Sequence, residues 1–167
     1  MMENTERDDL QPIVPAEFTV PLELVTDNMV LRPLRAEHND SDHAAWTSSI
    51  AHIKATPGFG PPRRWPEAEM PLEENLGDLE THWLHFEQRV GFTYTVLERS
   101  VLEQTGHETV IGCVYIYDDP TGGHEAEVRS WVRSDRAELD VELWSAVSEW
   151  LATNWPFETV LYAPRSV

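Results

Sequence analysis

The sequence predicts an α+β fold in which helices pack on a mixed, mostly antiparallel central sheet. Short runs of β-branched and aromatic residues, bounded by turn-forming residues, alternate with longer segments of helical periodicity. Three of the expected strands follow one another through short connections, which indicates an antiparallel meander. A helix then precedes the last strand, and this connection predicts that the last strand runs parallel to its neighbour.

The first half of the chain is expected to hold one strand and two helices. Residues 29–34 (MVLRPL) are typical of a strand, and residues 42–54 place their apolar side chains on one helical face. Prolines and glycines make residues 56–66 (TPGFGPPRRWP) an ordered loop. The clearest helix covers residues 72–90, and Gly91 stands where a left-handed residue would end it.

The second half is expected to hold the meander, a third helix and the last strand. Residues 92–97 (FTYTVL) are rich in β-forming residues, and residues 110–117 (VIGCVYIY) are apolar on both faces, as in a central strand. Residues 126–133 (AEVRSWVR) alternate between two faces. Helical periodicity covers residues 140–153, and residues 159–163 (TVLYA) form the last strand.

The charge of the chain excludes whole classes of partner. The 167 residues carry 30 Asp and Glu against 12 Lys and Arg, a net charge of -18, and Lys54 is the single lysine. A nucleic-acid binder needs a basic face to displace counterions, so we expect no nucleic-acid partner. The same charge argues against docking on anionic membranes, and no apolar run is long enough to span a bilayer.

Length and composition predict a single domain. Residues 1–17 carry acids and two prolines without apolar periodicity, so we expect a flexible acidic arm followed by one domain over residues 18–167. The first residues lack the basic and apolar regions of a signal peptide. Cys113 is the only cysteine, which excludes an intrachain disulfide. A soluble, cytoplasmic protein is therefore expected.

The order of these elements resembles that of the Gcn5-related N-acetyltransferase (GNAT) superfamily. The resemblance spans about residues 22–163, and it implies transfer of an acetyl group from acetyl-CoA to a small-molecule or peptide amine. The segments that carry it are LVTDNMVLRPL at 24–34, the two-helix insert at 42–90, VIGCVYIY at 110–117 and AEVRSWVR at 126–133.

The resemblance implies a coenzyme site at the end of the fourth predicted strand. In the family this strand binds the pantetheine arm, and a loop of the form Gln/Arg-x-x-Gly-x-Gly/Ala then holds the pyrophosphate through backbone N–H groups. Here the loop is SDRAELDV at 134–141, in which Leu139 and Val141 replace the two glycines. The implied coenzyme-binding residues are Trp131, Val132, Arg133, Arg136 and Ala137.

Two residues are candidates for proton transfer. Glu127 lies near the start of the fourth predicted strand, where the family often places the base that deprotonates the amine; the alternative is a carboxylate on a strand face that is solvated or paired with Arg129. Tyr162 is the only tyrosine beyond that strand and is the candidate for protonating the thiolate; the alternative is a packed aromatic residue. Candidates for binding the acceptor are Phe59, Trp65, Tyr94, Tyr115, Tyr117 and Arg129.

Other features receive structural interpretations. His82 and His85 lie three residues apart without a third ligand, so we expect solvated helix residues and no metal. Cys113 is expected to be a buried, inert thiol. The last strand would be an exposed edge, which makes a homodimer plausible. The competing functional hypothesis is a catalytically inactive GNAT-like module that binds a ligand or a protein.

Overall fold

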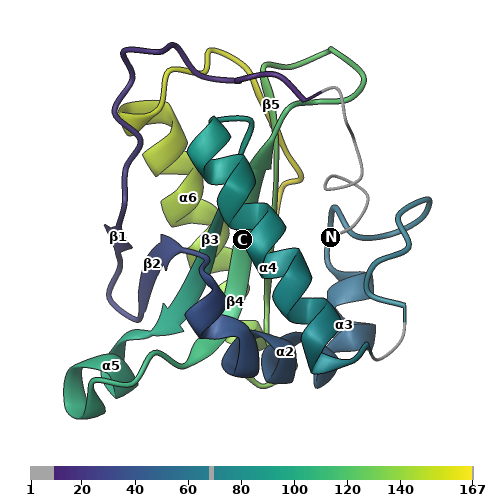
Figure 1. Ribbon diagram of the computed structural model, residues 1–167, viewed down its shortest axis with the longest axis vertical. Coiled ribbons are helices and arrows are strands. Elements are labelled where there is room, and N and C mark those ends of the chain that lie inside the picture. The colour runs from purple at the N-terminus through teal and green to yellow at the C-terminus, as the bar shows by residue number, and fades with distance from the viewer. Residues whose placement is uncertain (1–9, 68–69, 167) are drawn as a thin grey trace.

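A six-stranded sheet forms the centre of this computed structural model, which describes residues 10–67 and 70–166 (Figure 1). The strands lie in their sequence order, and every neighbouring pair is antiparallel except the last, in which β5 and β6 are parallel. The mixed, mostly antiparallel sheet expected from the sequence is confirmed. The strands are β1 (Leu24–Val25), β2 (Met29–Pro33), β3 (Gly91–Glu98), β4 (Val110–Tyr117), β5 (Ala126–Val132) and β6 (Val160–Tyr162).

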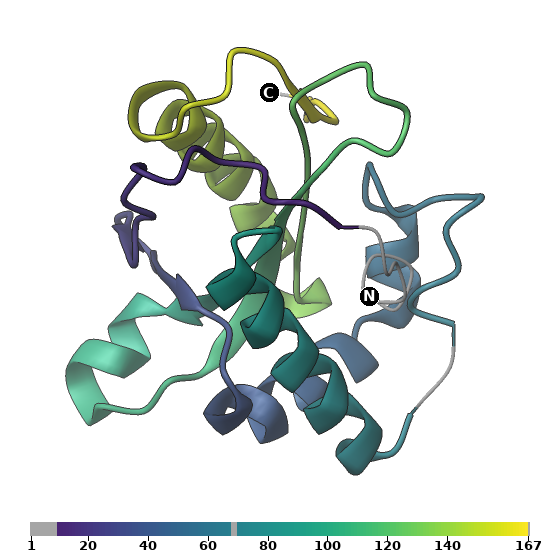
Figure 2. The same ribbon diagram turned by 45° about the horizontal axis from the view of Figure 1, so that its top comes forward.

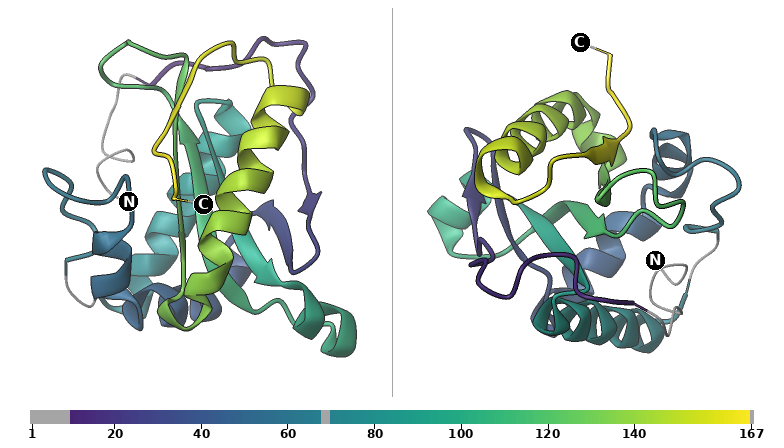
Figure 3. Two further views of the ribbon diagram at one scale, coloured as in Figure 1. Left: turned by 180° about the vertical axis from the view of Figure 1, so that it is seen from behind. Right: turned by 90° about the horizontal axis from the view of Figure 1, so that it is seen from above.

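Helices cover both faces of the sheet, with α4 on one side and α6 on the other (Figure 3, right). Helices α2 and α3 share the face of α4, whereas α5 projects from the end of β3 (Figure 1). Among the described residues, no helix is long and apolar enough to cross a membrane. The helices are η1 (Ala36–His38), α2 (Asn39–Thr47), α3 (Ile50–Ala55), α4 (Leu72–Gln88), α5 (Arg99–Thr105), η2 (Ser134–Leu139) and α6 (Asp140–Asn154).

The alternation along β5 divides its side chains between two cores. Ala126, Val128 and Val132 join the core under α6, whereas Trp131 joins the core under α2 and α4. Strand β4 is buried along its whole length, as expected for a central strand. The sheet thus presents chemically different faces to its two helical layers.

The helix predicted over residues 42–54 is divided in two. It begins three residues earlier, at Asn39, and breaks between α2 and α3 at Ser48 and Ser49. The Ser49 hydroxyl accepts a hydrogen bond from the backbone N–H of Ser134, at 2.9 Å. Serine side chains compete with helical hydrogen bonding, and here the competing bond attaches the break to η2.

Helix α4 ends at Gln88, and the left-handed residue that follows it is Arg89 rather than Gly91. Arg89 has a left-handed backbone, with φ of 64°, and its guanidinium bonds to the carbonyls of Pro15 and Phe18. Gly91 instead begins β3, where any Cβ would collide with the ring of Tyr117. Glycine is therefore required at this position for close packing rather than for helix termination.

A strap of residues 10–22 crosses one end of the sheet and leads into β1 (Figure 2). Val14 is buried, and the N–H of Ile13 donates to the carbonyl of Arg89. The hydroxyl of Tyr94 donates to the carbonyl of Pro21 at 2.7 Å. The second half of the predicted arm is therefore packed on the domain, because Ile13 and Val14 are apolar; the first half, residues 1–9, lies outside the described residues.

Candidate functional site

The candidate site lies at the fork where β5 and β6 diverge. The two strands pair from Ala126 opposite Val160 to Val128 opposite Tyr162, after which β6 ends and β5 continues to Val132. A pocket of about 460 Å³ opens beside this fork. Its walls come from residues 54–63 and from both strands. The pocket therefore lies between the predicted loop at 56–66 and the point where β5 and β6 stop pairing.

Glu127 lines this pocket and is held by the loop. Its Oε1 lies 2.6 Å from Nη2 of Arg63, and both side chains are largely buried. The alternation along β5 turns Glu127 toward residues 54–63 rather than toward α6. The structure thus places the predicted base in the pocket but pairs it with Arg63, not with Arg129.

Arg129 forms part of the pocket wall rather than a mobile ligand arm. Its side chain is buried, and its guanidinium carbon lies 5.2 Å from the ring centre of Phe59 and 5.7 Å from that of Tyr115. Gly58, with φ of +99°, passes directly over it, and a Cβ there would meet the Arg129 side chain at 3.4 Å. Cation–π contacts of this kind fix the position of a guanidinium.

Three of the predicted acceptor-binding aromatics, Phe59, Trp65 and Tyr115, form a layer beneath the pocket together with Trp131. Trp65 lies within aromatic contact distance of Phe59, Tyr115 and Trp131. The indole N–H of Trp131 donates to the hydroxyl of Tyr115 at 2.9 Å, and burial raises the pKa of Tyr115. None of these four side chains lines the pocket itself. Phe59 and Tyr115 contact Arg129, which does line the pocket, so this aromatic layer forms the floor behind it.

Tyr94 and Tyr117 lie outside the site. Tyr94 belongs to the core under α6, on the opposite face from Tyr115. The hydroxyl of Tyr117 lies 3.0 Å from Nδ1 of His82 and 2.9 Å from Nδ1 of His85. Both tyrosines were predicted to line the acceptor cleft, and the structure separates them from it.

The expectation that the two histidines of α4 are solvated is wrong. His82 and His85 are buried, and burial lowers the pKa of both imidazoles, which favours their neutral forms. They bracket the Tyr117 hydroxyl, and Gly91 leaves the space that this ring needs. Sequence spacing alone did not reveal this role. Among the described residues, no group of three or more His, Cys, Asp or Glu side chains is arranged to hold a metal ion.

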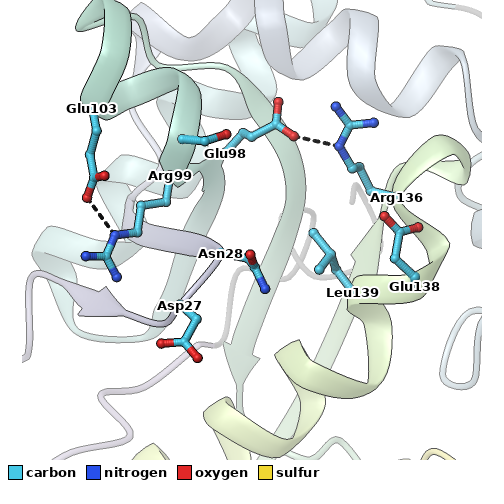
Figure 4. Close-up of a pocket in the computed structure, with 9 residues that line it drawn as sticks. Asp27, Asn28, Glu98, Arg99, Glu103, Arg136, Glu138 and Leu139 are labelled. Atoms are coloured by element: carbon cyan, nitrogen blue, oxygen red, sulfur yellow. Dashed lines mark hydrogen bonds and ion pairs between the residues drawn. The ribbon is translucent and has the colours of Figure 1, made fainter.

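The predicted pyrophosphate loop forms the 3₁₀ helix η2, and its arginines pair with acids. Arg133 makes two bonds to the Asp135 carboxylate, at 2.9 and 3.0 Å. Arg136 turns away from the fork toward Glu98, at 2.6 Å, and lines a separate pocket of about 650 Å³ (Figure 4). Trp131 and Val132 are buried on opposite faces of β5, and Ala137 is exposed. The five predicted coenzyme residues therefore do not converge on one site.

Arg165 is the residue at the fork that sequence reasoning missed. Its guanidinium bonds to the carbonyl of Ser130 at 2.9 Å and to the carboxylate of Asp140 at 2.7 Å. It also bonds to the carbonyl of Ala163 at 2.9 Å, and only 3% of its side chain is exposed. The C-terminal segment follows the space between β5 and α6 (Figure 3, left). No local pattern distinguishes Arg165, because its partners are distant in sequence.

Tyr162 lies next to this arginine. Its hydroxyl lies 2.5 Å from Oγ of Ser130, and burial raises the pKa of the phenol. The guanidinium of Arg165 lies 5.8 Å from the ring centre. Tyr162 is thus protonated at neutral pH and stands at the fork, on the side of α6.

Known structures match the chain in fold. A candidate ribosomal-protein-serine acetyltransferase from Vibrio cholerae aligns over 80% of this chain and 68% of its own, with 18% identity and a TM-score of 0.56. The ribosomal-protein-S5-alanine acetyltransferase from Vibrio fischeri aligns over 78% and 67%, with 12% identity and a TM-score of 0.58. The microcin C7 self-immunity acetyltransferase MccE, in complex with acetyl-CoA and AMP, aligns over 80% and 66%, with 10% identity and a TM-score of 0.58. No protein-family model and no curated protein matches the sequence.

The chain has the GNAT fold. It spans about two thirds of the length of these acetyltransferases. The resemblance inferred from element order is thereby confirmed at the level of the fold. Within the GNAT fold, the fork of β5 and β6 is where the resemblance implied the coenzyme arm, and here Arg165 fills it.

Proposed function

We propose that this protein is an N-acetyltransferase that moves an acetyl group from acetyl-CoA to a small-molecule or peptide amine. The observation that carries this proposal is the fork of β5 and β6, which opens beside a pocket containing Glu127. The GNAT fold supports the reaction class, since MccE has been solved with acetyl-CoA. Fold alone does not fix activity, so the proposal depends on the residues at the fork.

The residues at the fork fit one end of acetyl-CoA better than the other. Beyond Val128, β5 offers backbone groups that β6 no longer pairs, which suits an extended arm with amide groups. The phosphate end fits poorly, because η2 carries Asp135 and Glu138 and lacks glycine. Arg165 also occupies the Ser130 carbonyl. In this conformation the structure therefore does not accommodate the whole coenzyme.

The pocket supplies the chemistry for the acceptor. An amine must lose a proton before it attacks an acyl carbon, and Glu127 is the carboxylate that lines the pocket. Arg63 holds that carboxylate in one orientation. The pocket volume of about 460 Å³ is within the range of small-ligand sites. Glu127 is thus the proton acceptor, and Arg63 is its positioning residue.

The test combines coenzyme binding with acetyl transfer. Acetyl-CoA binding is measured by calorimetry, and transfer to a panel of amino acids, polyamines and short peptides is followed by mass spectrometry. Glu127→Gln should lower transfer roughly 10²–10⁴-fold while leaving acetyl-CoA affinity unchanged. Glu67→Gln, an exposed carboxylate on the same loop, is the matched control. Absence of binding at millimolar acetyl-CoA would contradict the proposal.

One observation favours a second candidate, a GNAT-fold module that binds a ligand without catalysis. Glu127, Arg133 and Arg136 all lie in ion pairs, so none is poised for substrate in this conformation. Acetyl-CoA binding without transfer to any amine of the panel would select this candidate. Transfer that depends on Glu127 would reject it.

A further inference from the structure

Arg165 crosses the plane of the sheet at the fork. Asp140, on the α6 side, is bound at 2.7 Å, and the carbonyl of Pro57, in the loop on the opposite side, lies 3.4 Å away. Between them the guanidinium bonds to the carbonyl of Ser130 at 2.9 Å. The side chain therefore closes the gap between β5 and the end of β6 from both faces.

The bond to Ser130 determines what this closure excludes. Ser130 lies two residues beyond Val128, the last residue of β5 that pairs with β6. Its carbonyl is therefore the first acceptor that an extended ligand alongside β5 would meet in the gap. Arg165 occupies that carbonyl, so a ligand arm and this guanidinium compete for the same atom and the same space.

The segment that carries Arg165 is attached mainly through this one side chain. Residues 163–166 belong to no strand or helix. Within the described part of the chain, the backbone hydrogen bonds outside helices and strands involve none of these residues. Breaking the bonds of a single guanidinium would therefore release the segment while the sheet stays paired.

We propose that residues 163–166 form an autoinhibitory segment, the latch, which the bonds of the Arg165 side chain hold in its closed position. In the closed state the latch fills the place of the coenzyme arm between β5 and β6, and the arm binds only after Arg165 has left Ser130 and Asp140. This inference rests on the proposed function, because it regulates access to the same site. The apparent affinity for the coenzyme is then reduced by the fraction of molecules that are open.

The first test measures coenzyme A affinity by calorimetry in the full chain and in Arg165→Ala. Removing a positive charge should weaken the binding of a polyanion, whereas removing the latch should strengthen it, so the two effects have opposite signs. The latch predicts binding at least about tenfold tighter in Arg165→Ala. Arg64→Ala removes the same charge from an exposed loop position and should not tighten binding.

The second test uses the unmodified chain, so it does not depend on the folding of a variant. Trypsin cleaves after arginine, and the bond after Arg165 is protected while that side chain is buried. Coenzyme A at saturation should accelerate cleavage after Arg165 severalfold, as followed by mass spectrometry. Cleavage after Arg64, which is exposed, serves as the internal control and should not accelerate.

The outcomes separate the two proposals. Equal coenzyme A affinity in the full chain and in Arg165→Ala, or slower cleavage after Arg165 with coenzyme, overturns the latch and leaves the proposed function intact. If neither protein binds coenzyme A at millimolar concentration, the proposed function fails and the latch fails with it. Tighter binding in Arg165→Ala together with faster cleavage supports the latch.

Discussion

Arg165 and Arg136 each pair with a carboxylate, but the surroundings of the two arginines differ. The two carboxylates are similarly exposed, at 17% for Glu98 and 20% for Asp140, but the arginines differ: Arg136 is 29% exposed and Arg165 only 3%. The family's phosphate-binding motif predicted a role for Arg136, because Arg136 stands at the first position of that motif. The buried arginine, Arg165, is the one that lies at the fork of β5 and β6.

The two arginines differ in how much water reaches the guanidinium, and this determines how much each one stabilises the fold. An exposed ion pair gains little, since water screens the attraction and side-chain entropy opposes it. A buried guanidinium has already lost its hydration, and the groups that it bonds inside the protein lose a donor that water cannot fully replace when the side chain is removed. The two pairs therefore look alike as contacts but should respond differently to substitution.

The largest effect is expected for Arg165→Ala. The variant leaves the Ser130 carbonyl and the Asp140 carboxylate without their donor, and we expect a loss of about 2–4 kcal/mol in the free energy of unfolding. Urea denaturation at neutral pH measures it. In Arg165→Ala/Asp140→Ala, part of the loss should be recovered. A loss below about 1 kcal/mol would contradict this prediction, because Arg165 would then stabilise the protein no more than an exposed ion pair does.

A second prediction concerns Asp42, a buried carboxyl held by Asn75 at 3.1 Å instead of by an arginine. Burial raises its pKa to about 6, with the Asn75 hydrogen bond acting in the opposite direction. The folded state thus binds the proton more tightly than the unfolded state, so stability falls as pH rises from about 4 through about 6 and stays lower above that.

Asp42→Asn removes the free-energy cost of keeping an ionised carboxylate buried at neutral pH. We expect a gain of about 1–3 kcal/mol at pH 7–8, since one pKa unit corresponds to about 1.4 kcal/mol, and a flatter stability profile between pH 4 and 6.5. Denaturant melts across that range measure both. Unchanged stability at pH 8 would mean that Asn75 already compensates the buried charge, which would sharpen the contrast with the Arg165–Asp140 pair.

Much of this architecture follows from the sequence, for reasons visible in particular elements. Charged residues at alternate positions located β5, and the run of apolar residues on both faces located β4. Helix α5 was missed because it buries no residue and therefore has no periodic face. Strand alternation placed Glu127 on the same face of β5 as Arg129, whereas its partner Arg63 lies 64 residues away and no local rule connects them.

The lack of local signals for distant contacts also explains why Tyr94 was expected to line the acceptor cleft and why Arg165 was not expected at the fork. The acceptor-site assignment of Tyr94 required knowing which face of β3 it occupies, and FTYTVL does not distinguish the faces. Arg165 has its partners 25 and 35 residues earlier in the chain. Contacts of this kind become visible only once the sheet order is fixed.

A third prediction examines the aromatic floor of the pocket. Tyr115→Phe removes the acceptor of the Trp131 indole N–H while keeping the ring, and leaves that buried donor unsatisfied. We expect a loss of about 1–2 kcal/mol in unfolding free energy by urea denaturation. Tyr115→Phe in a Trp131→Phe background should cost much less. Equal costs in the two backgrounds would show that this hydrogen bond does not stabilise the floor.

The smallest effect is expected at η2. Arg133→Ala removes an ion pair whose carboxylate, Asp135, is 61% exposed, and we expect a change below about 1 kcal/mol that shrinks further in added salt. Thermal melts at low and high ionic strength measure it. A loss as large as that of Arg165→Ala would remove the distinction between the two arginine regions.

The contact between Gly91 and Tyr117 has a consequence for how this chain can diverge. Because the ring fills the space where a Cβ would stand, position 91 can gain a side chain only if position 117 loses its ring. A relative that keeps an aromatic residue at position 117 must keep glycine at 91, and one that gains a side chain at 91 must shrink the residue at 117. Loss of the Tyr117 hydroxyl would in turn release His82 and His85 to new substitutions. Four positions on three elements thus form one unit of covariation, recognisable in any set of related sequences.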